Sequence, residues 1–178
     1  MAVELRVQFD VPARMRDGTI LYANIIRPAD DGSYPVALSR TPYCKDLSTS
    51  FLYLDAVRLA QAGYIVVVQD VRGRYKSEGE FKLFIHEAED GYDSVEWAAG
   101  LPGSNGNVGM YGISYLGFAQ WAAASLKPPH LRAIMPAMAV ADANDGMYFR
   151  GGALELGILA HLLVPSIGFD ILVRRLGG

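Results

Sequence analysis

The stretch Asn107-Val108-Gly109-Met110-Tyr111-Gly112-Ile113-Ser114-Tyr115-Leu116-Gly117 decides how the rest of the chain is interpreted. Its first half is typical of a short strand bounded by glycines, over residues 107–111. Residues 115–126 are apolar almost throughout, which predicts a buried helix. Ser114 therefore stands in the turn between a strand and a helix, with glycines two residues before it and three residues after it.

This spacing is typical of a nucleophile elbow, the turn that presents the catalytic serine of an α/β-hydrolase. Side chains in place of Gly112 and Gly117 would collide with the neighbouring strand or helix. The turn also directs the first backbone N–H groups of the helix and its dipole toward Ser114, where they can stabilise an oxyanion. One position departs from the Gly-x-Ser-x-Gly pattern, because Leu116 occupies the second glycine position. The alternative is a simple strand–helix turn without a catalytic role.

Composition limits the classes of protein that the chain can represent. Its 178 residues fit one domain, or one domain with the start of another. A net charge of -3 without a basic run argues against nucleic-acid binding. Cys44 is the single cysteine, which excludes an internal disulfide framework and favours a reducing compartment. No signal peptide and no run of about 18 apolar residues is present, so we expect a cytoplasmic protein without a membrane span.

The rest of the chain alternates strand and helix patterns after an antiparallel opening. Residues 3–9 alternate apolar and polar side chains, which predicts a half-buried strand, and Asp17-Gly18 marks a hairpin turn. Further strands are expected at 19–27, 34–39, 64–69 and 131–135, helices at 51–62, 86–99 and 153–164, and loops at 76–84, 102–106 and 142–152. This order predicts an α/β fold with a mostly parallel sheet and antiparallel amino-terminal strands.

Tyr43 is a second candidate site residue. It ends the segment Arg40-Thr41-Pro42-Tyr43, which follows an inner strand. Because Pro42 favours an extended conformation for Thr41, Tyr43 should lie on a stiff loop at the carboxyl end of that strand. Ligands of open α/β sheets bind just outside those ends. The alternative, which the residues alone favour, is a loop tyrosine packed on the rim of the sheet.

Charged residues near the same edge have two interpretations. Arg72 follows a β-branched strand and could bind a substrate carboxylate. The interpretation that we favour is an ion pair with Asp70 or with an acid on the next helix. Acidic side chains recur there at three-residue spacing, at positions 87, 90 and 93, and we interpret this stripe as structural.

A catalytic serine needs a base, and the base needs an orienting acid. In α/β-hydrolases both follow the serine in the chain. His86, His130 and His161 are each interpreted as structural or surface residues, with His130 at the end of the sheet away from the elbow. Asp142 or Asp145 could supply an acid at the site end, but no pair makes a convincing triad. No cluster has metal-ligand spacing, so we expect neither a metal nor a cofactor.

Several motifs, in sequential order, together resemble the X-Pro dipeptidyl-peptidase and cocaine-esterase-like family of α/β-hydrolases. The resemblance runs over about residues 11–163. The Gly-x-Ser-Tyr-x-Gly form is that family's version of the elbow, so Leu116 is no longer an anomaly. The motifs are Met15-Arg16-Asp17-Gly18, Arg27-Pro28, Arg40-Thr41-Pro42-Tyr43, Gln69-Asp70-Val71-Arg72-Gly73, Ser77-Glu78-Gly79, Asn107-Val108-Gly109, Gly112-Ile113-Ser114-Tyr115-Leu116-Gly117 and Gly151-Gly152-Ala153.

The resemblance implies a serine hydrolase that cleaves ester or amide bonds, X-Pro peptide bonds included, through an acyl-enzyme on Ser114. It implies that the Tyr43 hydroxyl and the backbone N–H of Tyr115 form the oxyanion hole. Residues 1–141 would form the amino-terminal part of the hydrolase core, and residues 142–178 would begin a helical cap. The family's acid and histidine come after the cap, so they are expected beyond residue 178, with the sheet incomplete at its carboxyl end.

Other interpretations stay open. The chain could be a truncated, non-catalytic fragment or an interaction remnant that lacks the acid and the histidine of a triad. An exposed apolar sheet edge would then favour self-association. Completion by another polypeptide or by a symmetry mate is a further alternative. The expected partner is a small-molecule or peptide substrate, and the residues do not decide between an ester and a peptide.

Overall fold

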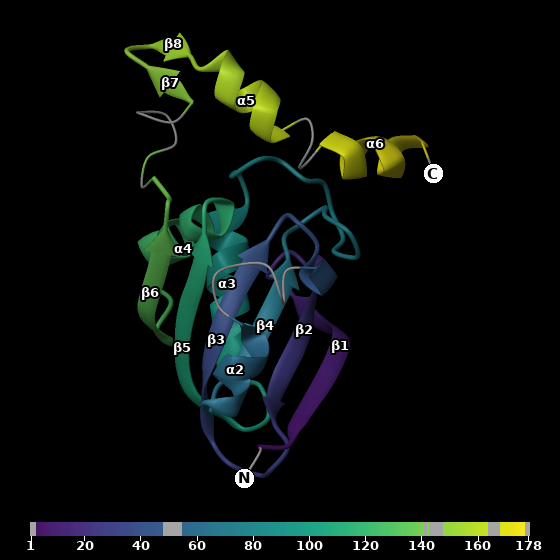
Figure 1. Ribbon diagram of the computed structural model, residues 1–178, viewed down its shortest axis with the longest axis vertical. Coiled ribbons are helices and arrows are strands. Elements are labelled where there is room, and N and C mark those ends of the chain that lie inside the picture. The colour runs from purple at the N-terminus through teal and green to yellow at the C-terminus, as the bar shows by residue number, and fades with distance from the viewer. Residues whose placement is uncertain (1–2, 48–54, 141, 143–147, 164–167, 177–178) are drawn as a thin grey trace.

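The computed structural model describes the chain except residues 1–2, 48–54, 141, 143–147, 164–167 and 177–178. A six-stranded sheet has the order β1-β2-β4-β3-β5-β6 (Figure 1). Its first two pairs, β1 with β2 and β2 with β4, are antiparallel, and the pairs formed by β3, β4, β5 and β6 are parallel. The predicted mostly parallel sheet is thus confirmed. The strands are β1 (Leu5–Arg14), β2 (Ile20–Pro28), β3 (Tyr34–Thr41), β4 (Ile65–Asp70), β5 (Ser104–Ile113) and β6 (Leu131–Ala137).

Helices cover both faces of the central strands. The helix α3 (Glu87–Ala99) and the elbow helix α4 (Tyr115–Ser125) pack on one face, and α2 (Ala56–Gln61) packs on the other. All of β4 is buried, as its β-branched run predicts for a strand covered on both sides. The helices α3 and α4 approach closely at Gly91, where a Cβ atom would lie 2.7 Å from the Cβ of Ala123.

The amino-terminal strand does not bury the apolar side chains that alternation predicts. Val7 is 46% exposed and Phe9 is 68% exposed. The cause is a bulge between Gln8 and Val11, where the register with β2 gains one residue. Because successive side chains of a strand point to opposite faces, one extra residue exchanges the faces before and after it. Val11 therefore reaches the core cluster on the α3 face, while Val7 and Phe9 stay exposed.

Two other boundaries differ from expectation. The strand before the elbow begins at Ser104 rather than at residue 107, because Ser104 pairs with Tyr34 ahead of a register shift. Part of the expected loop at 102–106 is therefore sheet. The helix expected over 51–62 is described only as α2, with the Asp55 side chain accepting from Val57 N–H at 2.9 Å as its cap. Residues 51–54 lie outside the described part of the chain.

The apolar sequence of the elbow helix predicts burial on all sides, but one side of the helix is exposed. Trp121, Ser125 and Leu126 are exposed. Gln120, its most polar side chain, is instead fully buried. The Gln120 amide donates to the carbonyl oxygens of Gly112 (3.2 Å) and Leu116 (3.0 Å), and its oxygen accepts from Met135 N–H at 2.9 Å. This side chain joins the helix to β5 and β6.

After β6 the described chain continues beyond the carboxyl ends of the parallel strands (Figure 1). It forms a hairpin of β7 (Phe149–Arg150) and β8 (Ala153–Leu154), then α5 (Leu156–Leu163) and α6 (Phe169–Leu176). The helix predicted from residue 153 is wrong at its start, because its first two residues pair with β7. Gly151 and Gly152, both at positive φ, make the two-residue turn that this hairpin requires.

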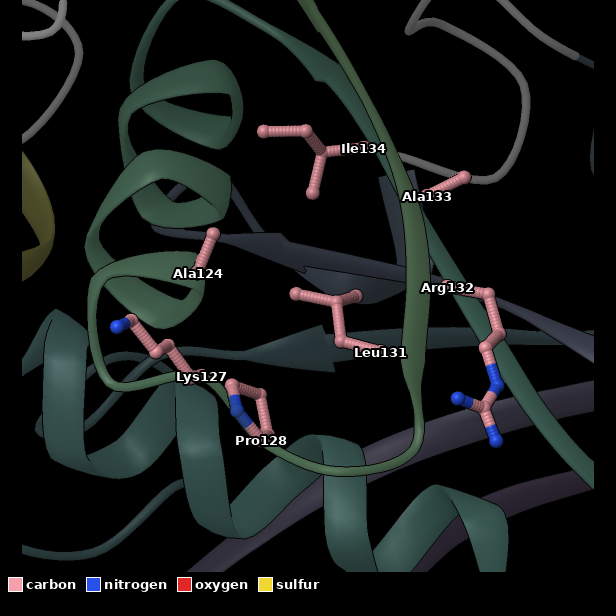
Figure 2. A pocket seen from close by; sticks show the side chains of 7 residues that line it. All are labelled: Ala124, Lys127, Pro128, Leu131, Arg132, Ala133 and Ile134. Atoms are coloured by element: carbon pink, nitrogen blue, oxygen red, sulfur yellow. The ribbon is translucent and has the colours of Figure 1, made fainter.

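Two hollows flank β6, which among the described residues has β5 as its single sheet neighbour. Figure 2 shows the first, of about 310 Å³, on the α4 side; it is lined by Ala124, Lys127, Pro128, Leu131, Arg132, Ala133 and Ile134. The second, of about 300 Å³, is lined by mostly apolar side chains on the opposite face, including Leu59, Tyr64 and Met135. Neither hollow is lined by Ser114 or Tyr43. No helix in the described residues is both long and apolar enough to cross a membrane.

Candidate active site

Ser114 occupies a strained turn between β5 and α4. Its backbone has φ 58° and ψ −119°, a conformation that residues other than glycine rarely adopt. The Ser114 N–H donates to the carbonyl oxygen of Ala137 at 2.9 Å, and its own carbonyl accepts from Gly117 (2.9 Å) and Phe118 (3.0 Å). The end of β6 and the first turn of α4 thus hold the strained residue, and the predicted strand–turn–helix is confirmed.

The two glycines of the elbow are required for the steric reason expected. A Cβ atom at Gly112 would lie 2.5 Å from the Cβ of Leu116, and one at Gly117 would lie 2.5 Å from the Cβ of Ala139. Both distances are too short for non-bonded carbon atoms. Residue 117, not 116, faces the chain after β6, while Leu116 is buried against Val71 and neighbouring aromatic side chains. This explains why the second glycine is displaced by one position.

Tyr43 lies beside Ser114, on the loop after β3. Its hydroxyl lies close enough to the Ser114 side chain for that side chain to lower the pKa of Tyr43, but burial, the larger influence, raises this pKa above its ordinary value. The hydroxyl therefore stays protonated and can donate a hydrogen bond. The ring meets that of Tyr115 edge to face, with centroids 6.5 Å apart. The structure thus brings all three predicted site residues together.

The loop that carries Tyr43 is bound to the segment after β4. The Lys45 backbone N–H donates to Asp70 Oδ1 at 2.7 Å, and Arg74 Nε donates to the carbonyl oxygen of Pro42 at 2.8 Å. Both bonds are buried, so the backbone on either side of Tyr43 is fixed independently of its own side chain. Asp70, at the end of β4, and Arg74 thus support the loop that carries the tyrosine.

A buried ammonium lies among carboxylates behind this loop. Lys45 Nζ is 2.9 Å from Asp10, 3.4 Å from Asp46 and 3.5 Å from Asp70. Burial raises the pKa of Asp70 to about 6, although the hydrogen bonds and charge of Lys45 oppose it. Burial by itself lowers the pKa of Lys45, but the hydrogen bond to Asp10 and the charges of all three carboxylates outweigh it, so that pKa is raised.

Tyr115 is the first residue of α4, so its backbone N–H has no acceptor within the helix. Its side chain is buried and held at several points. The hydroxyl donates to Glu87 Oε1 at 2.9 Å, and the ring stacks on Phe84 with centroids 4.9 Å apart. Burial, then the charge of Glu87, raises the pKa of Tyr115 well above its ordinary value. The phenol is therefore a permanent donor to the carboxylate.

Arg40 completes this arrangement from the sheet. Its Nη1 lies 2.5 Å from Glu87 Oε2, and its Nε donates to Gln69 Oε1 at 3.0 Å. Sequence reasoning missed the contact between Glu87 and Tyr115, and interpreted Glu87 only as an acid at a helix start. The signal in the sequence that could have indicated this contact is Arg40 near the end of an inner strand, together with Glu87 as the first residue of the helix that packs against that strand.

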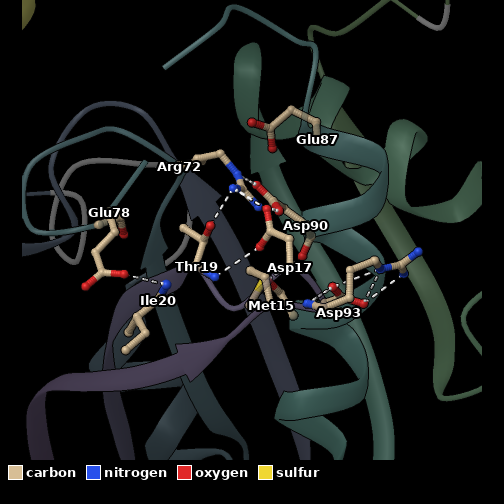
Figure 3. Close-up of polar contacts among 12 residues, drawn as sticks. Met15, Asp17, Thr19, Ile20, Arg72, Glu78, Glu87, Asp90 and Asp93 are labelled. Carbon is tan, nitrogen blue, oxygen red and sulfur yellow. Dashed lines mark hydrogen bonds and ion pairs between the residues drawn. The ribbon is translucent and has the colours of Figure 1, made fainter. Parts of the chain in front are cut away.

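Arg72 lies in a separate ion-pair network (Figure 3). Its guanidinium donates to both oxygens of Asp90, at 2.9 and 2.6 Å, and to Asp17 at 2.7 Å. The favoured interpretation, an ion pair with an acid on the next helix, is confirmed, with Asp90 rather than Asp70 as the partner. Asp93 similarly pairs with Arg16 at 2.8 Å. Asp90 and Asp93 of the acidic stripe are therefore structural.

The prediction of a surface loop at 76–84 is wrong for Ser77, because this residue is buried. Its hydroxyl donates to the carbonyl oxygen of Asp70 at 2.8 Å and accepts from Tyr22 N–H at 3.0 Å. The next residue, Glu78, accepts from the N–H of Ile20 at 2.9 Å (Figure 3). The side chains of Ser77 and Glu78 thus accept hydrogen bonds from backbone N–H groups of β2 and fix this part of the loop to the strand.

Within the described part of the chain, no hydrogen bond joins a histidine to Ser114. His130 lies at the start of β6, at the end of the sheet opposite the elbow as predicted, with Nδ1 2.7 Å from Glu96. His161 is exposed on α5, and His86 precedes α3 without a side-chain capping bond. Asp145 lies outside the described residues. Among those described, no group of three or more His, Cys, Asp or Glu could hold a metal ion.

The family model of the X-Pro dipeptidyl-peptidase (S15 family) matches residues 17–162 of this chain. The chain belongs to the X-Pro dipeptidyl-peptidase (S15) family. It is 42% identical over 159 residues to the cocaine esterase of Rhodococcus sp. (strain MB1 Bresler), a match that covers 86% of this chain and 27% of the esterase. The predicted family resemblance is therefore confirmed.

Solved structures of S15-like hydrolases share the fold. A CocE/NonD family hydrolase from Staphylococcus aureus has a TM-score of 0.78 and 35% identity, over 88% of this chain and 33% of its own. An α-amino acid ester hydrolase has a TM-score of 0.78 and 28% identity, over 93% of this chain and 30% of its own. The α/β-hydrolase fold is thus confirmed, and this S15 chain spans no more than about a third of the length of these relatives.

Proposed function

We propose that this chain carries the nucleophile and the oxyanion donors of a serine hydrolase that cleaves ester or amide bonds. The observation that carries the proposal is Ser114, held in a strained turn at the start of α4 with the Tyr43 side chain beside it. Membership of the S15 family supports it, since relatives of this chain include a cocaine esterase and an α-amino acid ester hydrolase.

In the proposed reaction, Ser114 Oγ attacks the carbonyl carbon of the substrate. As the new C–O bond forms, the π electrons of the carbonyl move to its oxygen, and the serine proton passes to a base. The Tyr43 hydroxyl and the Tyr115 N–H donate hydrogen bonds to the resulting oxyanion. When the intermediate collapses, the bond from the carbonyl carbon to the leaving oxygen or nitrogen breaks, and the base gives its proton to that atom. A neutral alcohol or amine leaves, and water then hydrolyses the acyl-enzyme.

We assign the base to a histidine and its orienting acid to a carboxylate, neither of which the described residues place at Ser114. Residues 1–141 act in this proposal as the amino-terminal part of the hydrolase core, and residues 142–178 as the start of a cap over the carboxyl ends of the strands. A cap in that position would contact the substrate beyond its reacting carbonyl. In this proposal, the contact between the cap and the substrate determines whether an ester, an amide or an X-Pro peptide bond is cleaved.

Fluorophosphonate labelling tests the proposal. In the full-length natural protein we expect one labelled serine, Ser114, located by mass spectrometry. The variant Ser114→Ala should lose the label and lower turnover by about 10⁴-fold or more. The matched control is Ser125→Ala, because Ser125 is an exposed serine of the same helix. Unchanged turnover in Ser114→Ala would contradict the proposal.

The same experiment on the 178-residue chain tests the non-catalytic alternative. The observation that favours this alternative is the absence, among the described residues, of any hydrogen bond between a histidine and Ser114. A folded chain that takes no label would mean that the elbow is present without a working base. Labelling at Ser114 that disappears on heat denaturation would mean that the chain, or its assembly, supplies a base.

A further inference from the structure

The peptide that joins Ser114 to Tyr115 carries the N–H that the proposed function uses as an oxyanion donor. As the first peptide of α4, it lacks the hydrogen bond to a residue four positions earlier that orients later peptides of the helix. Its orientation therefore depends on what holds Ser114 and Tyr115. The Ser114 backbone is bonded to β6 and α4, as described above. Gln120 ties α4 to β5 and β6 further along the helix. The restraint nearest to this peptide is the side chain of Tyr115.

That side chain cannot rotate without breaking buried contacts. Tyr115 is only 4% exposed, its ring is stacked on Phe84, and its hydroxyl ends on Glu87 Oε1 at 2.9 Å. An apolar side chain of similar size would fill this space equally well. Packing therefore explains the ring of Tyr115 but does not explain why the residue carries a hydroxyl.

Glu87 is itself immobile, because both of its carboxylate oxygens are engaged. Oε1 accepts from Tyr115, and Oε2 pairs with Arg40 Nη1 at 2.5 Å, with the two side chains 3% and 0% exposed. Arg40 also donates to Gln69 on β4. The carboxylate therefore joins β3, α3 and α4. A buried ion pair is weak evidence for stability, since desolvation offsets much of the attraction. What this pair fixes is the position of Glu87, because both carboxylate oxygens have a partner.

We propose that Glu87 is a positioning residue for the oxyanion hole: through the Tyr115 hydroxyl it orients the backbone N–H of Tyr115 toward the oxyanion formed at Ser114. This inference rests on the proposed function and adds a residue to it. Glu87 does not touch the substrate. It acts by holding the first residue of α4, whose displacement would move the N–H away while leaving the rest of the helix formed.

Two single variants of the full-length natural protein test the inference. Tyr115→Phe removes the hydroxyl and keeps the ring and the Arg40–Glu87 pair, and Glu87→Gln removes the charge and keeps the shape. For both we expect kcat for an ester to fall about tenfold with KM nearly unchanged, less than the roughly 10²–10³ lost when a donor is removed outright. The double variant should be no slower than the slower single variant, because both act through one contact.

A thionoester analogue supplies the readout that a merely structural role would not move. Thiocarbonyl sulfur accepts hydrogen bonds from N–H groups much more weakly than carbonyl oxygen. A displaced N–H should therefore slow the ester more than the thionoester, and the ester-to-thionoester rate ratio should fall several-fold in both variants. Glu89→Gln is the matched control, since Glu89 is an exposed acid in the same first turn of α3, and it should leave the ratio unchanged.

The outcomes separate this inference from the proposed function. If Ser114→Ala abolishes turnover while Tyr115→Phe and Glu87→Gln keep the wild-type ratio, the positioning role is overturned and the serine hydrolase stands. Equal losses on ester and thionoester, with a lowered Tm, would also overturn it, in favour of a structural role. Turnover that survives Ser114→Ala would overturn both. If Glu87→Gln does not fold, Tyr115→Phe decides, because it leaves the ion pair intact.

Discussion

At the scale of single residues, the candidate site consists of a strained serine and two tyrosines that act through different groups. Ser114 supplies a hydroxyl on a turn that β6 and α4 hold in place. Tyr43 points its hydroxyl at Ser114, while Tyr115 points its hydroxyl away, toward Glu87, and leaves its backbone N–H free of helical bonding. One tyrosine thus contributes a side chain and the other a main-chain group.

This division leads to a prediction for Tyr43→Phe. Removal of an oxyanion donor costs about 10²–10³ in kcat in enzymes of this kind, so we expect a loss of that order with KM little changed. The control is Tyr34→Phe, which removes a hydroxyl bonded to Asp30 instead. Steady-state kinetics of the full-length natural protein with an activated ester would measure both. Equal effects of the two variants would count against a role for Tyr43 in catalysis.

At the scale of elements, the segment after β4 orders the loop that carries Tyr43. Asp70 accepts from the Lys45 N–H at 2.7 Å with its carboxylate, and Arg74 binds the carbonyl oxygen of Pro42. The Asp70 carboxylate is fully buried, and burial raises its pKa from 3.8 to about 6. The folded state therefore holds this proton more tightly than the unfolded state.

The pH dependence of stability follows from that difference. The contribution of Asp70 is greatest below about pH 4 and is lost as the pH rises through about 6. The variant Asp70→Asn should not show this loss. The free energy of unfolding of the wild type relative to the variant should therefore fall by about 2 kcal/mol between pH 4 and pH 7.

Urea unfolding of the chain at several pH values would measure this difference. The control is Asp46→Asn, which removes a more exposed carboxylate beside the same Lys45 ammonium and should keep the wild-type slope. The charged groups that face Asp70 in this cluster are Lys45, Asp46 and Asp10. Parallel pH profiles for the wild type and Asp70→Asn would mean that Asp70 ionises normally in the folded chain.

At the scale of the whole molecule, the described sheet has two different edges. The strand β1 ends it on one side, and β6 ends it on the other (Figure 1). A hollow lies on each face of β6, and Figure 2 shows the one on the α4 side. A parallel edge strand beside apolar surface is a template for pairing with another chain. We therefore predict that the 178-residue chain self-associates through β6.

Sedimentation velocity over a range of concentrations would test this prediction. Met135→Lys places a charge on the β6 surface, where Met135 is 48% exposed, and should shift the chain toward monomer. Val7→Lys is the matched control, because Val7 is 46% exposed on the opposite edge strand, and it should leave association unchanged. A monomeric wild-type chain at all concentrations would contradict the prediction, and an effect of Val7→Lys alone would move the contact to β1.

Local sterics and periodicity account for the features that could be predicted from the residues alone. Gly112, Ser114 and Gly117 predict the elbow because a turn of this shape excludes side chains at two defined positions. The β-branched run of β4 predicts a central strand because both of its faces must be apolar. The antiparallel opening and the parallel sheet follow from the order of such elements, and the structure confirms both.

Tertiary structure alone decided what depends on residues far apart in the chain. The bulge in β1, which exposes Val7 and Phe9, is set by register against β2. Glu87 meets Tyr115 because α3 and α4 pack on one face of the sheet, 28 residues apart in sequence. A carboxylate at a helix start has many potential partners of similar energy. Only packing, which brings one arginine and one phenol within hydrogen-bond distance, selects among them.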